Sequence, residues 1–193
     1  MKAYVTLKVF NKKGKLIKRH KQKCKSFLKN FACMLRSMFC TVPSSSICFT
    51  DVVDVNGNTF TYPSDASKPF NNFVFACHKN AVNIGIVIGS GTSANTTNTY
   101  ALENIITSDL NVYSYSYGDI VVSNSTVSFK LQKKFTNKGP TINVNEVGLY
   151  AQALDKTEKW RTICVARDVL STTIQVQQDQ NLVVEYEIKI TIS

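Results

Sequence analysis

Alternating apolar and polar residues form the clearest pattern in the chain, and the longest example lies near its carboxyl end. Apolar residues occupy the even positions from Leu182 to Ile192, and charged or polar residues occupy the odd positions from Glu185 to Thr191. A second alternating run extends from Val127 to Phe135. Because successive side chains of a strand point to opposite faces, each run predicts a β-strand with one buried and one wet face.

One further predicted strand changes its alternation part-way along. Ile142 and Val144 have even numbers, whereas Val147 and Leu149 have odd ones. In a regular strand, this change of one residue would place the apolar side chains of one half on the solvent face. An extra residue in the strand keeps both halves facing the core. The pattern therefore predicts a β-bulge at Asn145–Glu146.

The amino-terminal part combines a hairpin with a helix. Alternation from Ala3 to Phe10, a turn at residues 11–14 and a return strand from Lys15 to Lys21 predict a β-hairpin. From Cys24 to Cys40 the apolar period becomes 3.6 residues, which predicts an amphipathic helix with Cys33 on its polar side. The apolar face of such a helix either packs on its own protein, or docks on a partner or a membrane.

These elements predict a mainly β protein: an antiparallel β-sandwich or jelly roll with an N-terminal hairpin and one helix. Residues 1–40 are expected to form the basic hairpin and helix, packed on the sandwich or reaching from it. Residues 41–193 are expected to form the sandwich domain. Asn56–Gly57 predicts a hairpin turn of type I′, in which both central residues need positive φ. Residues 160–165 predict a strand and residues 63–80 a loop.

The stretch Gly89-Ser90-Gly91 follows an apolar run and raises the question of a phosphate-binding loop. Such a loop needs a helix directly after the glycines, and a P-loop also needs Gly-Lys-Ser/Thr. Here polar residues without helical period or lysine follow, and Ala94 stands where a dinucleotide fingerprint needs its third glycine. The stretch is therefore expected to be a turn between two pieces of a sheet.

Positive charge is concentrated at the amino end. The chain has 23 Lys and Arg against 13 Asp and Glu, and twelve of the basic residues but no acidic residue fall within residues 1–40, so the remainder carries −2. This asymmetry favours a polyanion, an acidic protein surface or an anionic membrane as a partner, with a plain solvated face as the alternative. No aromatic residue lies among the candidate bases, so stacking has no support. The candidate polyanion-binding residues are Lys12, Lys13, Lys15, Lys18, Arg19, Lys21, Lys23 and Lys25.

Candidates for catalysis and metal binding are few. The six cysteines contain no C-x-x-C pair, and only His20 and His78 could join them, so the spacing of a zinc site is absent. Cys77 and His78 are adjacent and would point to opposite faces of a strand, which disfavours a catalytic pair. Glu185 and Glu187 share a face on which solvating charges are expected. We therefore expect no enzyme, no cofactor and no metal.

Signals for membrane insertion or secretion are also missing from the pattern. No run of 18 apolar residues occurs, and residues 1–20 carry seven Lys and Arg without an apolar segment. We expect no membrane span and no signal peptide, and therefore synthesis in the cytoplasm with reduced thiols.

Several segments occur in an order that resembles a β-sandwich module of structural proteins in tailed phages and archaeal viruses. The segments are IVIGSGT, YALENII, VSFKLQKKFTN, TINVNEVGLYA, ARDVLSTTIQV and LVVEYEIKITI. The resemblance covers most of the chain and is weakest from Cys40 to Lys79. Its most specific motifs are NEVGLY, from Asn145 to Tyr150, and ARDVLS, from Ala166 to Ser171. It implies a virion component without an active site to carry over.

The two motifs suggest architectural roles for four residues: Glu146, Gly148, Arg167 and Asp168. Gly148 follows the predicted bulge, where backbone strain or close packing favours glycine. Asp168 is expected to pair with Arg167 or to satisfy backbone N–H groups, together with Ser171, where the next strand begins.

Three kinds of function stay open. The first is a structural protein of the virion, made in the host cytoplasm: a capsid decoration, head–tail junction, tail or fibre-base subunit that binds copies of itself and other virion proteins, with closed rings or trimers expected. The second is a jelly-roll coat protein or nucleic-acid-binding protein that holds the genome with residues 1–40. The third is a host-surface adhesion domain that contacts glycans through residues 95–100 and 113–117.

Overall fold

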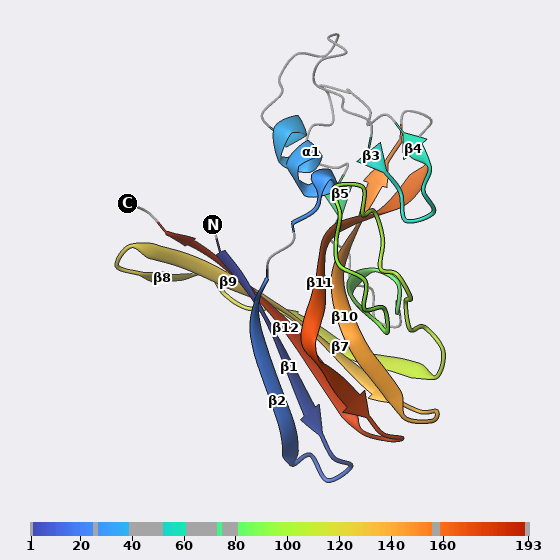
Figure 1. The fold of residues 1–193 in the computed structure, drawn as a ribbon. Coiled ribbons are helices and arrows are strands. Elements are labelled where there is room, and N and C mark those ends of the chain that lie inside the picture. The colour runs from blue at the N-terminus through green and yellow to red at the C-terminus, as the bar shows by residue number, and fades with distance from the viewer. Residues whose placement is uncertain are drawn as a thin grey trace.

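The computed structural model describes residues 2–24, 27–38, 52–60, 73–74, 81–155 and 159–191. The protein is mainly β, with two antiparallel sheets packed face to face and a short helix beyond one end of the sandwich (Figure 1). The predicted β-sandwich with an N-terminal hairpin and one helix is confirmed.

The larger sheet has six strands in the order β2-β1-β12-β9-β7, and β8 pairs with another part of β9. β1 lies between β2 and the C-terminal strand β12, so the basic hairpin contributes two strands to the sandwich itself. The strands are β1 (Lys2–Phe10), β2 (Leu16–Cys24), β7 (Leu110–Tyr117), β8 (Val121–Ser123), β9 (Thr126–Asn137) and β12 (Asn181–Thr191).

The smaller sheet has four strands, in which β5 and β6 pair with different parts of β10 and β11 lies on its other side. Where the sequence predicts a bulge, the pairing of β10 with β11 shifts register: Val144 lies opposite Ile174, whereas Glu146 lies opposite Val169. The strands are β5 (Phe73–Val74), β6 (Gly85–Gly89), β10 (Ile142–Leu154) and β11 (Trp160–Val176).

The core lies between the two sheets. Val5 and Leu7 of β1 and Val184 of β12 are at most 1% exposed and belong to the same apolar cluster as residues of β6, β10 and β11. The alternation predicted for β12 holds for its first half. Ile190 is 46% exposed, because this end of β12 projects with β8 and β9 beyond the smaller sheet (Figure 1).

Lys133 connects the two sheets. It lies on β9 with a side chain that is 0% exposed. Its Nζ donates hydrogen bonds to the carbonyl oxygens of Ala81 at 2.7 Å, Ile84 at 2.8 Å and Ile86 at 2.9 Å. A buried ammonium group of the larger sheet therefore fixes the segment that leads into β6 of the smaller one.

The helix α1 (Lys29–Met38) is shorter than predicted. The prediction that it begins at Cys24 is wrong, because Cys24 is the last residue of β2 and pairs with Ala3. Cys33, predicted on the polar side, is 8% exposed and packs in the core. Cys40 lies outside the described residues.

A hydrogen-bonded contact with β11 delays the start of this helix. Phe27 forms an isolated β-bridge with Ala166, and the N–H of Leu28 donates to the carbonyl of Val165 at 3.0 Å. The chain thus lies on β11 in extended form before it turns into α1.

The predicted hairpin around Asn56–Gly57 is present as β3 (Val52–Val53) and β4 (Thr59–Phe60), but its turn is not of type I′. Gly57 has a φ of 82°, whereas Asn56 is not in the positive-φ region. The Asp54 carboxylate accepts the N–H groups of Asn56 and Asn58, each at 2.9 Å, and so holds a different turn. Apart from β5, residues 63–80 lie outside the described residues.

Among the described residues, no helix combines the length and the apolar character that crossing a membrane requires.

Candidate anion-binding face

The eight candidate polyanion-binding residues do not lie on one surface. Lys12, Lys13 and Lys15 are exposed at the turn between β1 and β2. Lys18 lies on the inner side of β2, where its Nζ donates to the carbonyl of Thr173 in β11 at 3.0 Å. This lysine therefore joins the edges of the two sheets.

Three of the candidates share the outer side of the larger sheet. Arg19, Lys21 and Lys23 of β2 are exposed and pair with β1 residues that alternate with the apolar core residues of that strand. Since cross-strand partners point to the same side of a sheet, all three face away from the core. Lys25 lies outside the described residues.

The same outer side collects lysines from β1, β9 and β12 that are distant in sequence. Eight basic side chains and two carboxylates lie on it, which gives a net charge of +6. We call this surface the basic face. Its basic residues are Lys2, Lys8, Arg19, Lys21, Lys23, Lys130, Lys134 and Lys189.

The two carboxylates lie among these lysines and pair with them. Glu185 lies between Lys8 and Lys130, with an oxygen 3.6 Å from each ammonium nitrogen. Glu187 pairs in the same way with lysines of β2 and β12, at 3.6 and 3.3 Å. Each carboxylate thus pairs with two lysine side chains on the sheet. Partly exposed ion pairs of this kind contribute little to stability.

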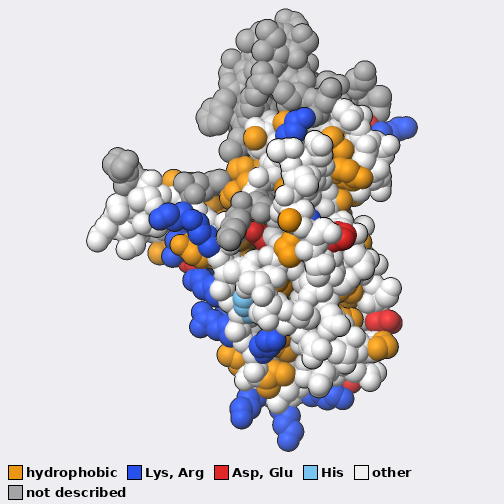
Figure 2. Space-filling model, in the orientation of Figure 1, with side chains coloured by type: hydrophobic (Ala, Val, Ile, Leu, Met, Phe, Trp, Pro, Cys, Tyr) orange, Lys and Arg blue, Asp and Glu red, His pale blue; other side chains and the backbone are white. Residues whose placement is uncertain are grey.

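The remaining cations are available to a ligand. The four that form no ion pair with another described residue are Lys2, Arg19, Lys23 and Lys134. In Figure 2, Lys and Arg side chains gather along the left and lower margins of the molecule, over β2 and the β1–β2 turn. Tyr4 adds an aromatic ring to this face, although it lies outside the basic stretch of residues 12–25. The Lys21 Nζ is 5.0 Å from the centroid of its ring.

The four motif residues lie elsewhere, in and beside a buried ion pair. Glu146 of β10 is 0% exposed, and its Oε2 accepts the Nε–H of Arg167 of β11 at 2.6 Å. Three backbone N–H groups complete its coordination: Gly91 at 3.0 Å, Glu103 at 3.1 Å and Asn104 at 2.9 Å. The motifs NEVGLY and ARDVLS therefore meet at one carboxylate.

The Glu146–Arg167 ion pair also holds the loop of residues 90–105 in place through hydrogen bonds. Arg167 donates through Nη1 to Asn95 Oδ1 at 2.8 Å, and the Asn95 amide donates to the carbonyl of Arg167 at 2.7 Å. Glu103 lies 3.6 Å from Arg167 Nη2. Hydrogen bonds from Ser93 and Thr92, together with the charge of Arg167, lower the pKa of Glu103.

The expectation that Gly89-Ser90-Gly91 forms no phosphate loop gains a structural reason. No helix follows these residues, and the N–H of Gly91 is occupied by Glu146 of the same chain. A Cβ at Gly91 would lie 2.6 Å from the Glu146 Oε1. The glycine is needed because an internal carboxylate approaches its backbone closely.

Gly148 and Asp168 have packing roles, one of which differs from its prediction. A Cβ at Gly148 would lie 2.3 Å from a methyl group of Leu102, so close packing explains this glycine. Asp168 does not mark the start of a strand, because it lies within β11 and is buried. Its Oδ2 lies 3.5 Å from the hydroxyl of Tyr186. It does not pair with Arg167, since neighbours on a strand face opposite ways.

The described cysteines are Cys24, Cys33 and Cys164, and all three are free thiols. Burial, with a contribution from Asp168, raises the pKa of the Cys24 thiol, and burial also raises the pKa of Cys164. Within the described residues, no group of three His, Cys, Asp or Glu side chains is placed to hold a metal ion.

Comparison with known proteins identifies no relative: no family model, no curated protein and no solved structure matches the chain.

Proposed function

We propose that the protein is a structural component of a virion, such as a capsid-decoration, head–tail-junction, tail or fibre-base subunit, and that it acts by self-assembly and docking. The observation that carries this proposal is the Glu146–Arg167 pair. The charged residues of the two motifs that resemble phage and archaeal-virus proteins bind each other and the loop 90–105, so their chemistry maintains the shape of the sandwich.

An exposed apolar row at one end of the larger sheet supports self-assembly. Val122 of β8 lies opposite Val127 of β9, which lies opposite Ile190 of β12. Val122 is 71% exposed and Ile190 46% exposed. Contiguous apolar side chains on a soluble surface are typical of protein–protein contacts, and a second copy of the chain is the occupant that repeated virion parts would supply.

The first test combines solution mass with a variant in this row. We expect the protein to form a closed multimer by light scattering, and Val122→Lys to reduce it to a monomer, because a charge would be buried in the contact. Ser123→Lys is the matched control, since it adds the same charge on the opposite face of β8.

Detection of the multimer in one symmetric layer of a virus particle by electron microscopy would complete the support. A wild-type protein that stays monomeric at all concentrations and is absent from purified particles would contradict the proposal.

Binding of nucleic acid is a second function, which the basic face favours. Lysines from four strands converge on it, and they include residues outside the amino-terminal 40. A surface that neutralises phosphates binds nucleic acid without sequence preference, and its affinity falls steeply as the salt concentration rises.

The test removes two unpaired charges from this face. We expect Arg19→Gln/Lys23→Gln to reduce the slope of log K against log salt by about 1.8 for duplex DNA, about 0.9 for each lost phosphate contact. Fluorescence anisotropy with a labelled duplex of arbitrary sequence measures this slope.

The matched control, Lys29→Gln/Lys159→Gln, removes the same charge from exposed positions outside the basic face and is expected to leave the slope unchanged. Equal slopes for the two double variants would show that net charge, and not the basic face, determines binding.

A further inference from the structure

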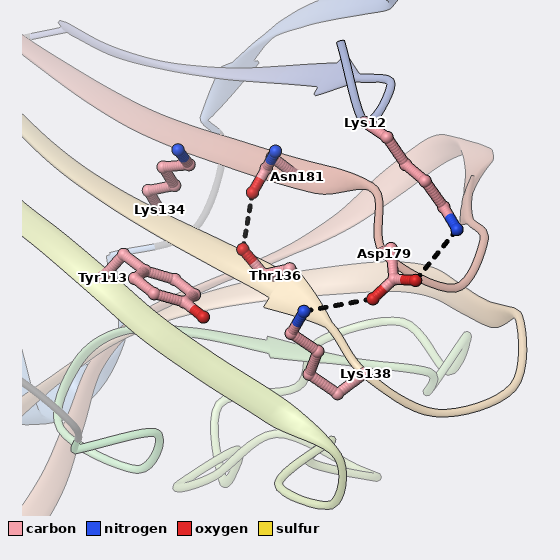
Figure 3. Close-up of a pocket in the computed structure, with 7 residues that line it drawn as sticks. All are labelled: Lys12, Tyr113, Lys134, Thr136, Lys138, Asp179 and Asn181. Atoms are coloured by element: carbon pink, nitrogen blue, oxygen red, sulfur yellow. Dashed lines mark hydrogen bonds and ion pairs between the residues drawn. The ribbon is translucent and has the colours of Figure 1, made fainter. Parts of the chain in front are cut away.

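A pocket lies at the end of the basic face, where the β1–β2 turn approaches the turn between β11 and β12 (Figure 3). It is an open depression of about 330 Å³. Three lysines and one carboxylate line it: Lys12, Lys134, Lys138 and Asp179. These side chains come from three separate parts of the sequence, so no local sequence motif predicts the pocket.

Asp179 organises two of the lysines. Its Oδ2 lies 2.9 Å from Lys12 Nζ, and its Oδ1 lies 3.0 Å from Lys138 Nζ. A φ of 60° at Asp179 and a hydrogen bond from its N–H to the carbonyl of Asn137 fix the turn that presents the carboxylate. One carboxylate therefore holds two ammonium groups, and a net positive charge remains.

Neutral groups in the same pocket are also oriented as donors. Thr136 donates from Oγ1 to the Oδ1 of Asn181 at 2.5 Å, which directs the Asn181 amide NH₂ away from Thr136 (Figure 3). Tyr113 Oη accepts a hydrogen bond from Asn111 Nδ2 at 3.3 Å, so its own hydrogen is left for another acceptor. Tyr113 also lines the pocket, and its hydroxyl points toward Lys138 (Figure 3).

We infer that this pocket binds a phosphate group. The three ammonium groups and one carboxylate give a net charge of +2, which matches the charge of about −2 that a phosphate monoester carries near neutral pH. A phosphate offers several strong acceptor oxygens, and the lysine, amide and hydroxyl donors surround one open space. Free inorganic phosphate and the terminal phosphate of a nucleic acid share this chemistry, and only the second source rests on the proposed nucleic-acid binding.

The test is a titration with inorganic phosphate at constant ionic strength, followed by calorimetry and by thermal unfolding. We expect saturable binding that raises the midpoint of unfolding above that in sodium chloride. Lys134→Gln and Lys138→Gln should each weaken phosphate binding about tenfold, because each removes a charge-assisted hydrogen bond.

Lys130→Gln is the matched control, since Lys130 lies on the same face of β9 but outside the pocket. It should leave the affinity unchanged. Equal effects of phosphate and chloride, or an equal loss for Lys130→Gln and Lys134→Gln, would overturn the inference and leave only general attraction by the basic face.

A second arm separates the two sources of phosphate. Oligonucleotides with a 5′-phosphate and with a 5′-hydroxyl are compared on the wild type and on Lys134→Gln. A preference for the 5′-phosphate that Lys134→Gln abolishes identifies a nucleic-acid end, and saturable phosphate binding without this preference identifies free phosphate. If the wild-type protein binds neither oligonucleotide, the nucleic-acid proposal is wrong. The titration with inorganic phosphate would then still test whether the pocket binds phosphate.

Discussion

Replacing Glu146 by glutamine is expected to lower the free energy of unfolding by about 3–5 kcal/mol. The substitution keeps the size of the side chain and removes its charge. Arg167, which is 3% exposed, would then be a buried cation whose remaining carboxylate neighbour is Glu103, 3.6 Å from its Nη2. The amide NH₂ that replaces one carboxylate oxygen would also face N–H donors, so hydrogen bonds to the loop would be lost.

Urea unfolding measures this loss, and hydrogen exchange localises it. The amides of Gly91 and Asn104 donate to Glu146 in the native protein, and their protection should fall in the variant before that of the sandwich core. Glu185→Gln is the matched control: its carboxylate lies on the basic face, where partly exposed pairs contribute about 0–1 kcal/mol.

A double variant, Glu146→Met/Arg167→Met, separates charge burial from hydrogen bonding. It should cost less than the sum of the two single changes, because no uncompensated charge remains. A Glu146→Gln protein as stable as Glu185→Gln would contradict the view that this pair maintains the sandwich.

Replacing Lys133 by methionine is expected to cost about 3 kcal/mol. Methionine has a similar length and suits an apolar core, yet it cannot donate to the three carbonyl groups of residues 81, 84 and 86. Those acceptors would stay buried beside an apolar group, and the connection between β9 and the start of β6 would be lost.

Urea unfolding again provides the measurement, with Lys134→Met as the control. Lys134 is the next residue of β9 and its side chain lies on the outer face, where substitutions usually change stability by about 0.5 kcal/mol or less. If Lys133→Met and Lys134→Met unfold at the same urea concentration, the buried ammonium group is not a structural connection.

The strands could be predicted from the sequence because their determinants are local. The parity of Ile142 and Val144 against Val147 and Leu149 locates the bulge, and the alternation in β9 and β12 identifies the core side. The same rule would have identified Lys133, whose odd number places it with Phe135 on the inner face.

Features that depend on distant partners could not be read in this way. The helical period from Cys24 is overridden by pairing of β2 with β1 and by the contact of Phe27 with β11. The expectation that Asp168 satisfies backbone N–H groups where a strand begins failed because Asp168 lies within β11, and its Oδ2 lies 3.5 Å from the hydroxyl of Tyr186 on another strand.

The candidate site also depends on register. Sequence order groups the cations of residues 12–25 together, but the pleat sends Lys18 to the inner side and Arg19 to the outer side of the same strand. Only the order of the strands brings Lys130 and Lys134 to the basic face, and only the two turns bring Lys12 to Asp179.

The position of β2 at the border of the larger sheet has a consequence for how copies can meet. A border strand presents backbone groups that pair with a strand of another molecule and extend the sheet indefinitely, as in fibrous aggregates. Two such borders brought together would place Arg19, Lys21 and Lys23 against the same residues of the other copy, and like charges directly opposite one another repel. Growth of the sheet in this direction, by pairing of one β2 with the β2 of another copy, is therefore discouraged.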